Sequence, residues 1–351
     1  MIERALIMAG GTGGHVFPAL AVATELKKAG LELSWLGAKG GMEENLVTDP
    51  DIQLYLINVS GLRGKGTTAK MAAPWRLVRA IWQANKVFSR VNPSVVIGFG
   101  GFASGPGGLV AWLRRRRLVI HEQNAVAGTT NRILQRFAGR VLEAFPGSLP
   151  DAELVGNPVR RDVETIPAPQ DRLAGREGSY RVLVLGGSQG ARFLNQHVPA
   201  ALSQSGKPVE VWHQCGKRWL DETGSSYEQL GLDVRLESFI GDMAGAYSWA
   251  DLVICRAGAM TIAELAAAGA ASLLVPFPYA IDDHQTANAN WLAEAGGARV
   301  VQENEASEQG LVEIVRDLLD RGRLLAMAAA ARTRTNRAAA TLIADICQGG
   351  A

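Results

Sequence analysis

Short apolar runs alternate with longer amphipathic segments along most of this 351-residue chain. Apolar runs that end in glycine or a polar cluster are typical of buried strands, whereas apolar residues every three or four positions indicate helices. In the first half, the pattern predicts strands at 5–8, 33–36, 53–57, 95–97, 118–121 and 141–142, and helices at 16–29, 75–90 and 109–115. In the second half, it predicts strands at 182–185, 209–213, 234–236, 252–255 and 272–275, and only helices beyond about residue 308.

This alternation predicts an α/β protein with two doubly wound parallel-sheet domains that face each other across a cleft. The proline-containing stretch 146–178 lies between the halves and is interpreted as a linker. Ligands of such sheets bind at the carboxyl ends of the strands. We therefore expect the glycine turns at 10–14, 98–101 and 105–108 to lie at a ligand-binding edge.

A glycine loop follows one strand near the middle of the chain, in the sequence RVLVLGGSQGAR from Arg181 to Arg192. A strand, a tight turn and a helix start expose backbone N–H groups beside the positive end of a helix dipole, which favours phosphate. The sequence RALIMAGGTGGH, from Arg4 to His15, repeats this plan. The repeat predicts a phosphate-binding loop in each half.

The same central loop also fits the Gly-x-Ser-x-Gly pattern of the α/β-hydrolase nucleophile elbow, with Ser188 as the nucleophile. Asp251 or Asp282 and then His284 follow in the order that a hydrolase triad requires. The first loop, however, has Thr12 where the elbow would have serine. A phosphate loop explains both halves, whereas an elbow explains one.

Polar residues at strand ends supply further candidates in the first half. His15 is expected at a helix N-terminus, where the dipole favours a neutral imidazole that can accept a proton; a capping or packing role is equally compatible with the spacing. Glu122, in the cluster HEQN at 121–124, is a candidate general base or orienting group, and Asn124 a hydrogen-bonding residue.

The second half contains another predicted helix start, at Gly258 and Ala259, whose free N–H groups form a second anion site. Glu264 lies one turn further and can accept hydrogen bonds from ribose, although a solvated helix carboxylate is the commoner case. The segment Asp282–Asn288 has no convincing metal-ligand spacing and reads as a helix start with Asp caps. Gln285 is then placed to contact sugar hydroxyls.

Composition narrows the class of protein. Hydrophobic residues make up 47% and charged residues 20%, and the formal net charge of +2 gives no support for nucleic-acid binding. The three cysteines have no paired or metal-like spacing, which favours a reducing compartment. We find no signal-peptide pattern, no membrane-spanning apolar run and no acidic residue placed for a dinucleotide ribose.

The predicted helix at 75–90 has two apolar faces. A core face is expected from Leu77, Ile81, Ala84 and Phe88. A separate stripe predicts contact with an anionic membrane surface and comprises Trp75, Val78 and Trp82, bordered by the cations Arg79 and Lys86. Lys65, Lys70, Arg76 and 114–117 add positive charge nearby. A helix buried on two sides, with a solvated basic edge, is the alternative.

Several motifs together resemble the MurG family of bacterial N-acetylglucosaminyl transferases. The matching sequences are AGGTGGHVFPALAVA (9–23), SGLRGKG (60–66), GFGGFASGPGGLVAW (98–112), HEQNAVAGTTN (121–131), VGNPVR (155–160), GGSQGAR (186–192), CRAGAMTIAE (255–264) and DDHQTANA (282–289). They occur in family order over nearly the whole chain.

The resemblance implies the GT-B fold: an acceptor and membrane-contacting domain at 1–160, a UDP-sugar domain at 161–335, and a last helix near 336–346 that packs back on the first. It implies inverting transfer of N-acetylglucosamine from UDP-N-acetylglucosamine to the C4 hydroxyl of the N-acetylmuramyl unit of lipid I, which gives lipid II, without cofactor or metal. The implied location is the cytoplasmic face of the bacterial inner membrane, beside other cell-wall synthesis proteins. A UDP-sugar 2-epimerase and a non-catalytic UDP-sugar sensor are the alternatives.

The family's site residues carry over motif by motif. The implied donor-binding residues are Thr12, Gly13, Gly14, Asn124, Arg160, Ser188, Ile240, Ala259, Met260, Thr261, Ile262, Ala263, Glu264 and Gln285. Ser188 and the Gly258 helix start would hold the diphosphate and stabilise the leaving UDP. Glu264 would bind the ribose, and Ile240 would meet the uracil through its backbone. His15 is the first choice for the general base and Glu122 the second.

Overall fold

The computed structural model describes residues 3–59 and 73–350. Contacts within the chain define two compact units. The first unit combines Met1–Val159 with Asn336–Ala351, and the second is Arg160–Thr335. Lys65, Lys70 and the SGLRGKG motif lie outside the described residues.

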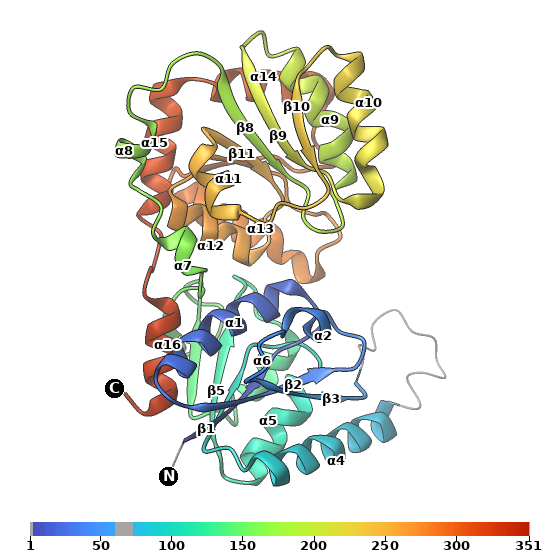
Figure 1. The fold of residues 1–351 in the computed structure, drawn as a ribbon, viewed down its shortest axis with the longest axis vertical. Helices are drawn as coiled ribbons and strands as arrows, with labels where there is room; N and C mark the ends of the chain where they lie inside the picture. Colours follow the sequence, from blue (N-terminus) through green and yellow to red (C-terminus); the bar gives the residue numbers. More distant parts are fainter. Residues whose placement is uncertain (1–2, 60–72, 351) are drawn as a thin grey trace. The chain divides into compact units, whose positions relative to one another are not determined.

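The first unit contains a parallel sheet with the strand order β3-β2-β1-β4-β5-β6-β7 among the described residues (Figure 1). Its strands are β1 (Arg4–Met8), β2 (Glu32–Ala38), β3 (Gln53–Ile57), β4 (Val95–Gly98), β5 (Arg117–Glu122), β6 (Arg140–Glu143) and β7 (Glu153–Leu154). Its helices are α1 (Gly13–Lys28), α2 (Glu43–Leu46), α4 (Ala73–Val91), α5 (Ser104–Leu113), α6 (Thr129–Leu134) and α16 (Ala339–Gln348).

Helices cover both faces of this sheet because successive strand side chains point to opposite faces. Ala5 and Ile7 of β1 belong to a core that includes α1 and α16. Leu6 and Met8 belong to a core with α4 and α5 on the other face. Figure 1 shows the red helix α16 beside the blue α1. The last helix therefore completes the hydrophobic core of the first unit, although it follows the second unit in sequence.

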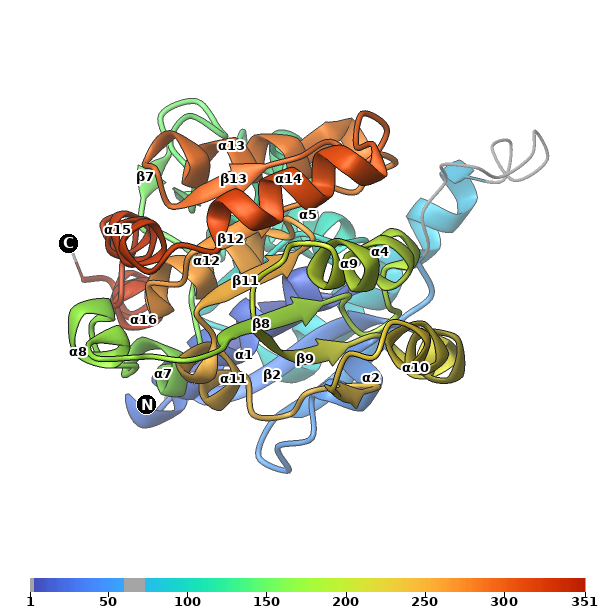
Figure 2. The same ribbon diagram turned by 90° about the horizontal axis from the view of Figure 1, so that it is seen from above.

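The second unit repeats this plan with the parallel order β10-β9-β8-β11-β12-β13 among the described residues. Its strands are β8 (Tyr180–Leu185), β9 (Val209–Gln214), β10 (Val234–Glu237), β11 (Leu252–Cys255), β12 (Ser272–Leu274) and β13 (Ala298–Val300). Its α-helices are α7 (Arg161–Glu164), α8 (Pro169–Leu173), α9 (Arg192–Ser203), α10 (Leu220–Gln229), α11 (Met243–Trp249), α12 (Ala259–Ala268), α13 (His284–Glu294), α14 (Glu308–Leu318) and α15 (Arg321–Arg332), with short 3-10 turns η1 (Lys217–Trp219) and η2 (Ile281–Asp283). Figure 2 shows α9 and α14 side by side along the sheet.

Both sheets have a topological switch point, where the strand order reverses and ligands of doubly wound folds bind. It lies between β1 and β4 in the first unit and between β8 and β11 in the second. The loops that follow these four strands begin near residues 9, 99, 186 and 256. The predicted strands are all confirmed, and the fold of each unit is Rossmann-like.

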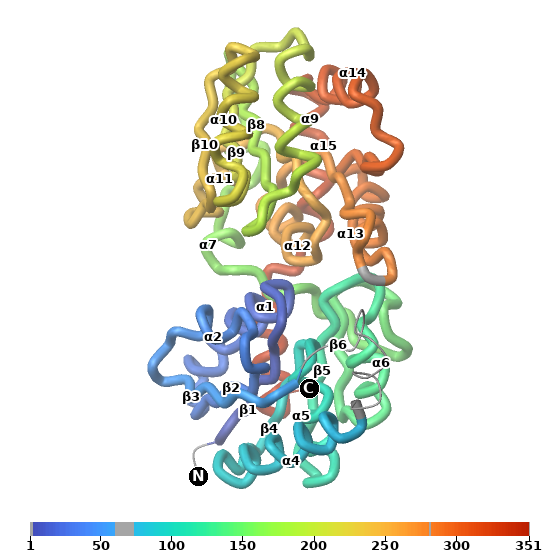
Figure 3. Tube along the Cα trace, turned by 90° about the vertical axis from the view of Figure 1, so that its right-hand side faces the viewer, coloured from blue at the N-terminus to red at the C-terminus, as the bar shows by residue number. Residues whose placement is uncertain are grey.

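Three expectations about local structure are wrong. The 146–178 stretch is not a simple linker, because it contains β7, α7 and α8, and Val155 and Val163 are fully buried. The glycines at 105–108 lie in the first turns of helix α5 rather than in a loop. Their small size allows close packing on the sheet, because a Cβ at Gly107 would lie 2.3 Å from the Met8 sulfur. Leu77 of α4, expected in the core, is 51% exposed. Figure 3 shows α4 alongside α5 at the edge of the unit.

Candidate active site

The loop after β8 has a backbone that only glycine can adopt at key positions. Gly187 and Gly190 have φ values of 76° and 75°. A Cβ at Gly190 would lie 2.1 Å from the Cys215 carbonyl oxygen, so this loop packs directly on the end of β9. Ser188 remains exposed at the tip, and α9 begins two residues after the last glycine. The Gly186 and Gly190 N–H groups are bonded to the Gln214 and Gly187 carbonyls, so the exposed part of the loop is residues 187–189.

A cavity of about 610 Å³ lies at this loop, a volume within the usual range for small-molecule sites. It is lined by Gly186, Ser188, Gln189, Gly190, Ala191, Arg192, Phe193, Lys217, Arg218, Trp219, Arg256, Phe277, Gln285 and Glu303. The cationic side chains come from three different loops, and Glu303 is already paired with Arg256 at 2.6 Å. The net positive charge beside a helix N-terminus suits a polyanion such as a diphosphate.

The neighbouring loop after β11 ends in the predicted helix start. Gly258 is the N-cap of α12, and no side chain caps the N–H groups of its first turn. Ala259 and Ile262 are buried, whereas Met260, Thr261 and Ala263 are partly exposed. The second predicted anion-binding helix start is therefore present at the switch point of the second unit.

Glu264 is not a solvated helix carboxylate, because its side chain is only 15% exposed. Oε2 accepts a 3.0 Å hydrogen bond from the Tyr247 hydroxyl, and Oε1 lies 3.4 Å from an Arg160 nitrogen. Burial raises the pKa of Glu264, while Arg160 and the Tyr247 hydrogen bond oppose the rise. Two partners thus hold the carboxylate in one orientation, as a hydroxyl-binding acceptor requires.

Gln285 connects the two loops of the pocket. Its Oε1 accepts hydrogen bonds from the backbone N–H groups of Ala257 and Phe277, at 3.2 and 2.9 Å. The group that remains for a ligand is therefore the donor Nε2. Asn288, one turn further, is buried and donates to the Ala257 carbonyl at 3.2 Å. The sequence placed both residues on one helix face, but Asn288 lies in the interior.

Ile240 is buried, and its N–H donates to Oε1 of Gln214 at 2.9 Å. With that N–H bonded, a base bound here would use the Ile240 carbonyl. Sequence reasoning missed Gln214, because a glutamine at the end of a predicted strand has no distinctive pattern. It also missed Arg218 and Trp219, which sit on the short turn η1.

The loop after β1 carries His15 in the first turn of α1, with Thr12 as the N-cap. Nδ1 of His15 lies 3.1 Å from the Thr12 hydroxyl oxygen. The ring also packs against the loop after β4, since a Cβ at Gly100 would lie 3.2 Å from His15 Nε2. These two loops approach closely, because a Cβ at Gly101 would lie 2.2 Å from the Gly10 carbonyl oxygen.

One N–H group of this first loop is already bonded within the chain, which the expectation from the repeat did not include. The Gly11 N–H already donates to Oε2 of Glu43 at 3.0 Å, and Glu43 is fully buried. A carboxylate of the chain itself thus occupies the place where an anion was expected. The glycine pattern alone could not reveal this, because Glu43 begins α2, more than 30 residues further along the chain.

Glu122 is nearly fully buried and is bonded to its own loop. Oε1 accepts the Asn124 N–H at 3.0 Å, and Oε2 accepts the Gly128 N–H at 3.1 Å and Nδ2 of Asn131 at 2.9 Å. Both carboxylate oxygens of Glu122 are therefore engaged by donors from residues 124–131. The geometry favours the orienting role over that of a base, and it orients Asn124.

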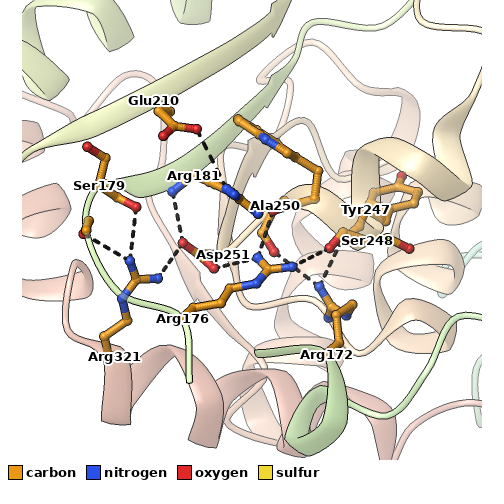
Figure 4. A network of polar contacts seen from close by, with 12 residues as sticks. Arg172, Arg176, Ser179, Arg181, Glu210, Tyr247, Ser248, Ala250, Asp251 and Arg321 are labelled. Carbon is orange, nitrogen blue, oxygen red and sulfur yellow. Dashed lines mark hydrogen bonds and ion pairs between the residues drawn. The ribbon is translucent and has the colours of Figure 1, made fainter. Parts of the chain in front are cut away.

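The hydrolase triad that uses Asp251, one of the two that the sequence allowed, is excluded by the position of this residue. This residue precedes β11 at the amino end of the sheet, where it accepts the Arg181 N–H, whereas Ser188 follows the carboxyl end of β8. Figure 4 shows Asp251 surrounded by arginines, with Arg176 and Arg321 paired to its carboxylate. Parallel strands keep their opposite ends apart, so this aspartate cannot serve an elbow at Ser188.

The stripe on α4 is exposed as predicted. Trp75, Val78 and Trp82 are 80%, 58% and 55% exposed, and Nζ of Lys86 lies 3.6 Å from the Trp82 ring centre. Part of the basic run 114–117 is engaged within the unit, since Arg114 donates to Asn85 on α4. Among the described residues, no helix is long and apolar enough to cross a membrane, and no group of three potential metal-ligating side chains occurs.

Two Rossmann-like units, one with a cationic pocket at its switch point, are the architecture of the GT-B fold, which glycosyltransferases share. Residues 5–143 match the glycosyltransferase family 28 N-terminal domain, and residues 181–343 match the corresponding C-terminal domain. The chain belongs to glycosyltransferase family 28.

Relatives and solved structures agree with this assignment. The chain is 52% identical to the UDP-N-acetylglucosamine--N-acetylmuramyl-(pentapeptide) pyrophosphoryl-undecaprenol N-acetylglucosamine transferase of Marinobacter nauticus, over 98% of this chain and 97% of that protein. It is 51% identical to the protein of the same name from Nitrosococcus oceani, over 99% and 98%. MurG of Acinetobacter baumannii superposes with a TM-score of 0.89 at 41% identity, covering 99% of both chains. A calicheamicin glycosyltransferase, 17% identical with a TM-score of 0.69 over 99% of each chain, shares the fold.

Proposed function

We propose that this protein transfers N-acetylglucosamine from UDP-N-acetylglucosamine to the C4 hydroxyl of the N-acetylmuramyl unit of lipid I, which gives lipid II. The observation that carries the proposal is the nearly full-length similarity to transferases whose name states both substrates. The cationic pocket at Ser188 supports it, because a UDP-sugar presents a diphosphate. The same name gives no support to an epimerase, a sensor or a hydrolase.

In the proposed reaction, the acceptor hydroxyl attacks the anomeric carbon of the donor as the bond to UDP breaks. The departing diphosphate gains negative charge, which the N–H groups of the Ser188 loop and of the α12 N-terminus stabilise. Gln285 donates from Nε2 to a sugar hydroxyl, and Glu264 accepts from the ribose. Thr12, Gly13, Gly14 and Asn124 are the remaining residues that we propose for donor binding.

We assign the general base to His15 rather than Glu122. His15 Nδ1 faces the Thr12 hydroxyl oxygen at 3.1 Å, so an Nδ1–H tautomer leaves the lone pair on Nε2. The α1 N-terminus also disfavours a resident positive charge on this ring. Glu122, by contrast, is committed to donors of its own loop.

The exposed stripe of α4 is proposed to rest on the anionic cytoplasmic face of the bacterial inner membrane, where lipid I is held. Trp75 and Trp82 would enter the headgroup region, while Arg79 and Lys86 would contact anionic headgroups. Other cell-wall synthesis proteins are proposed as neighbours there.

One experiment separates the candidate activities. The protein is supplied with UDP-N-acetylglucosamine, with and without a lipid I analogue, and both UDP and the glycosylated product are followed. A transferase releases UDP only with acceptor, an epimerase converts donor without acceptor, and a sensor turns over nothing. Release of UDP that does not depend on acceptor would contradict the proposal.

The base assignment has its own test. The His15→Ala variant should lose roughly 10²- to 10⁴-fold in turnover, the usual contribution of a positioned general base. UDP binding should be unchanged, because the pocket lies in the other unit. Turnover near that of the wild type would remove His15 from the role.

A further inference from the structure

Glu43 is a buried carboxylate without a place in the reaction described above. It begins the short helix α2, and its side chain has no exposed surface. Oε2 accepts the Gly11 N–H at 3.0 Å, and Oε1 accepts the Ala38 N–H at 2.6 Å. It therefore joins the loop after β1, which carries Thr12 and His15, to the end of the neighbouring strand β2.

Three glycines make the room for this carboxylate. A Cβ on Gly10, Gly37 or Gly41 would lie 2.1, 2.6 or 2.2 Å from the nearest Glu43 atom. Gly10 and Gly37 follow or end adjacent strands, and Gly41 belongs to the turn before α2. None of the three has a positive φ, so their small size rather than backbone freedom is what this site requires.

The two units therefore use the same loop plan in opposite ways. The loop after β8 leaves Ser188 exposed at a cationic pocket. In the loop after β1, the Gly11 N–H already has Glu43 Oε2 as its acceptor, so this N–H is not available to an external anion. Fixing Gly11 also fixes the four residues that follow it, up to the His15 ring in the first turn of α1.

We propose that Glu43 is a positioning residue, which holds the first glycine loop so that Thr12 and His15 adopt the geometry for proton transfer. The inference rests on the proposed function for its catalytic consequence. The structural part, that Glu43 determines where the His15 ring lies, is independent of the activity.

The isosteric variant Glu43→Gln replaces one acceptor by a donor that faces a backbone N–H. We expect the kcat to fall roughly tenfold to hundredfold, the effect of a displacement of about 1 Å at a reacting group. Binding of UDP alone should remain unchanged, because the pocket at Ser188 lies in the second unit. Glu44→Gln is the matched control, because Glu44 is the next residue, is exposed and accepts the Gly40 N–H rather than a group of the first glycine loop.

A second variant moves the carboxylate without removing its charge. In Gly41→Ala, the new Cβ would overlap Glu43 Oε2 and displace it, at a position whose φ alanine can adopt. It should reproduce the kcat loss of Glu43→Gln. Adding Glu43→Gln to His15→Ala should then cost little more, because two residues that act through one group are not additive.

Histidine NMR tests the positioning directly, since the chain has five histidines. The His15 ring resonances should shift in Glu43→Gln and Gly41→Ala, but not in Glu44→Gln. A His15 shift with unchanged kcat would leave the positioning intact and overturn His15 as the base. Unshifted His15 resonances in a folded Glu43→Gln variant, or additive losses in the double variant, would overturn the inference.

Discussion

Asp251 is the most heavily bonded carboxylate at the amino end of the second sheet. Its side chain is 3% exposed. Oδ1 is paired with Arg176 at 2.7 Å, and Oδ2 with Arg321 at 2.5 Å and with the Arg181 N–H at 2.9 Å. These partners come from the α8–β8 connection and the adjoining start of β8, and from α15, so one carboxylate joins two segments that are distant from it and from each other in sequence (Figure 4).

The Asp251→Asn substitution keeps the shape and removes the charge. It leaves Arg176, whose side chain is 17% exposed, without its anion, and it places an amide donor against arginine donors. Removing one partner of a buried ion pair costs about 3–5 kcal/mol. Burial lowers the pKa of the nearby Arg172 to about 10, the positive charge of Arg176 lowers it further, and the negative charge of Asp251 raises it. The Asp251→Asn substitution therefore also removes a charge that stabilises protonated Arg172.

Glu210→Gln is the matched control, because Glu210 pairs with Arg181 at 3.7 Å and both side chains are about half exposed. Such a surface pair contributes within about 1 kcal/mol. Urea unfolding followed by tryptophan fluorescence measures both variants, and Trp249 lies two residues from the substitution. If both variants lose equal amounts of unfolding free energy, within about 1 kcal/mol, the Asp251 network does not stabilise the second unit in the way argued here.

Three further predictions concern the donor site, the membrane stripe and pH. Because burial raises the pKa of Glu264, the affinity for UDP-N-acetylglucosamine should fall as the pH is lowered through that raised value. The Glu264→Gln variant should bind the donor roughly tenfold or more weakly at neutral pH, with little pH dependence. Unchanged donor affinity in calorimetry would contradict the assignment of Glu264 to the ribose. Replacing Trp75 and Trp82 by Ser should weaken co-sedimentation with anionic vesicles by roughly tenfold or more, and identical sedimentation would argue against the stripe. Burial lowers the pKa of His121 to about 4 and of His213 to about 3, so the unfolded chain, with an ordinary value near 6.5, binds more protons as the pH falls below that value. Each should therefore remove about 1.4 kcal/mol of unfolding free energy per pH unit between about pH 6 and 4, and urea titrations at pH 7, 6 and 5 without such a slope would contradict the burial of neutral imidazoles.

Much of the fold was predictable from local pattern. Apolar runs marked every strand in the centre of each sheet, and the glycine turns marked the carboxyl ends of β1 and β8. The family was predictable from the motifs, which occur in the family's order over nearly the whole chain. The strands that were not predicted are β7 and β13, which are only two and three residues long and lie at sheet edges. A run this short has no recognisable hydrophobic period.

The sequence predicted which residues belong to the candidate site better than it predicted which of their atoms are available to a ligand. Ser188 and Gln285 do line one pocket, as the family motifs implied. The sequence could not show that Gln285 presents Nε2, because its Oε1 is bonded to backbone groups of two other loops. Nor could it distinguish a solvated Glu264 from one held by Tyr247 and Arg160.

The sequence by itself determined which segments become strands and helices, because the spacing of the apolar residues in each segment shows which positions must be buried. It also determined where the backbone must turn tightly, since glycines there admit conformations and contacts that other residues cannot. Only the tertiary structure decided which partners meet: β1 lies between β2 and β4, and this order brings Glu43 to the first glycine loop. The same glycine pattern therefore binds a carboxylate of the chain in one unit and opens onto a cationic pocket in the other, because what fills a turn depends on its neighbours in space.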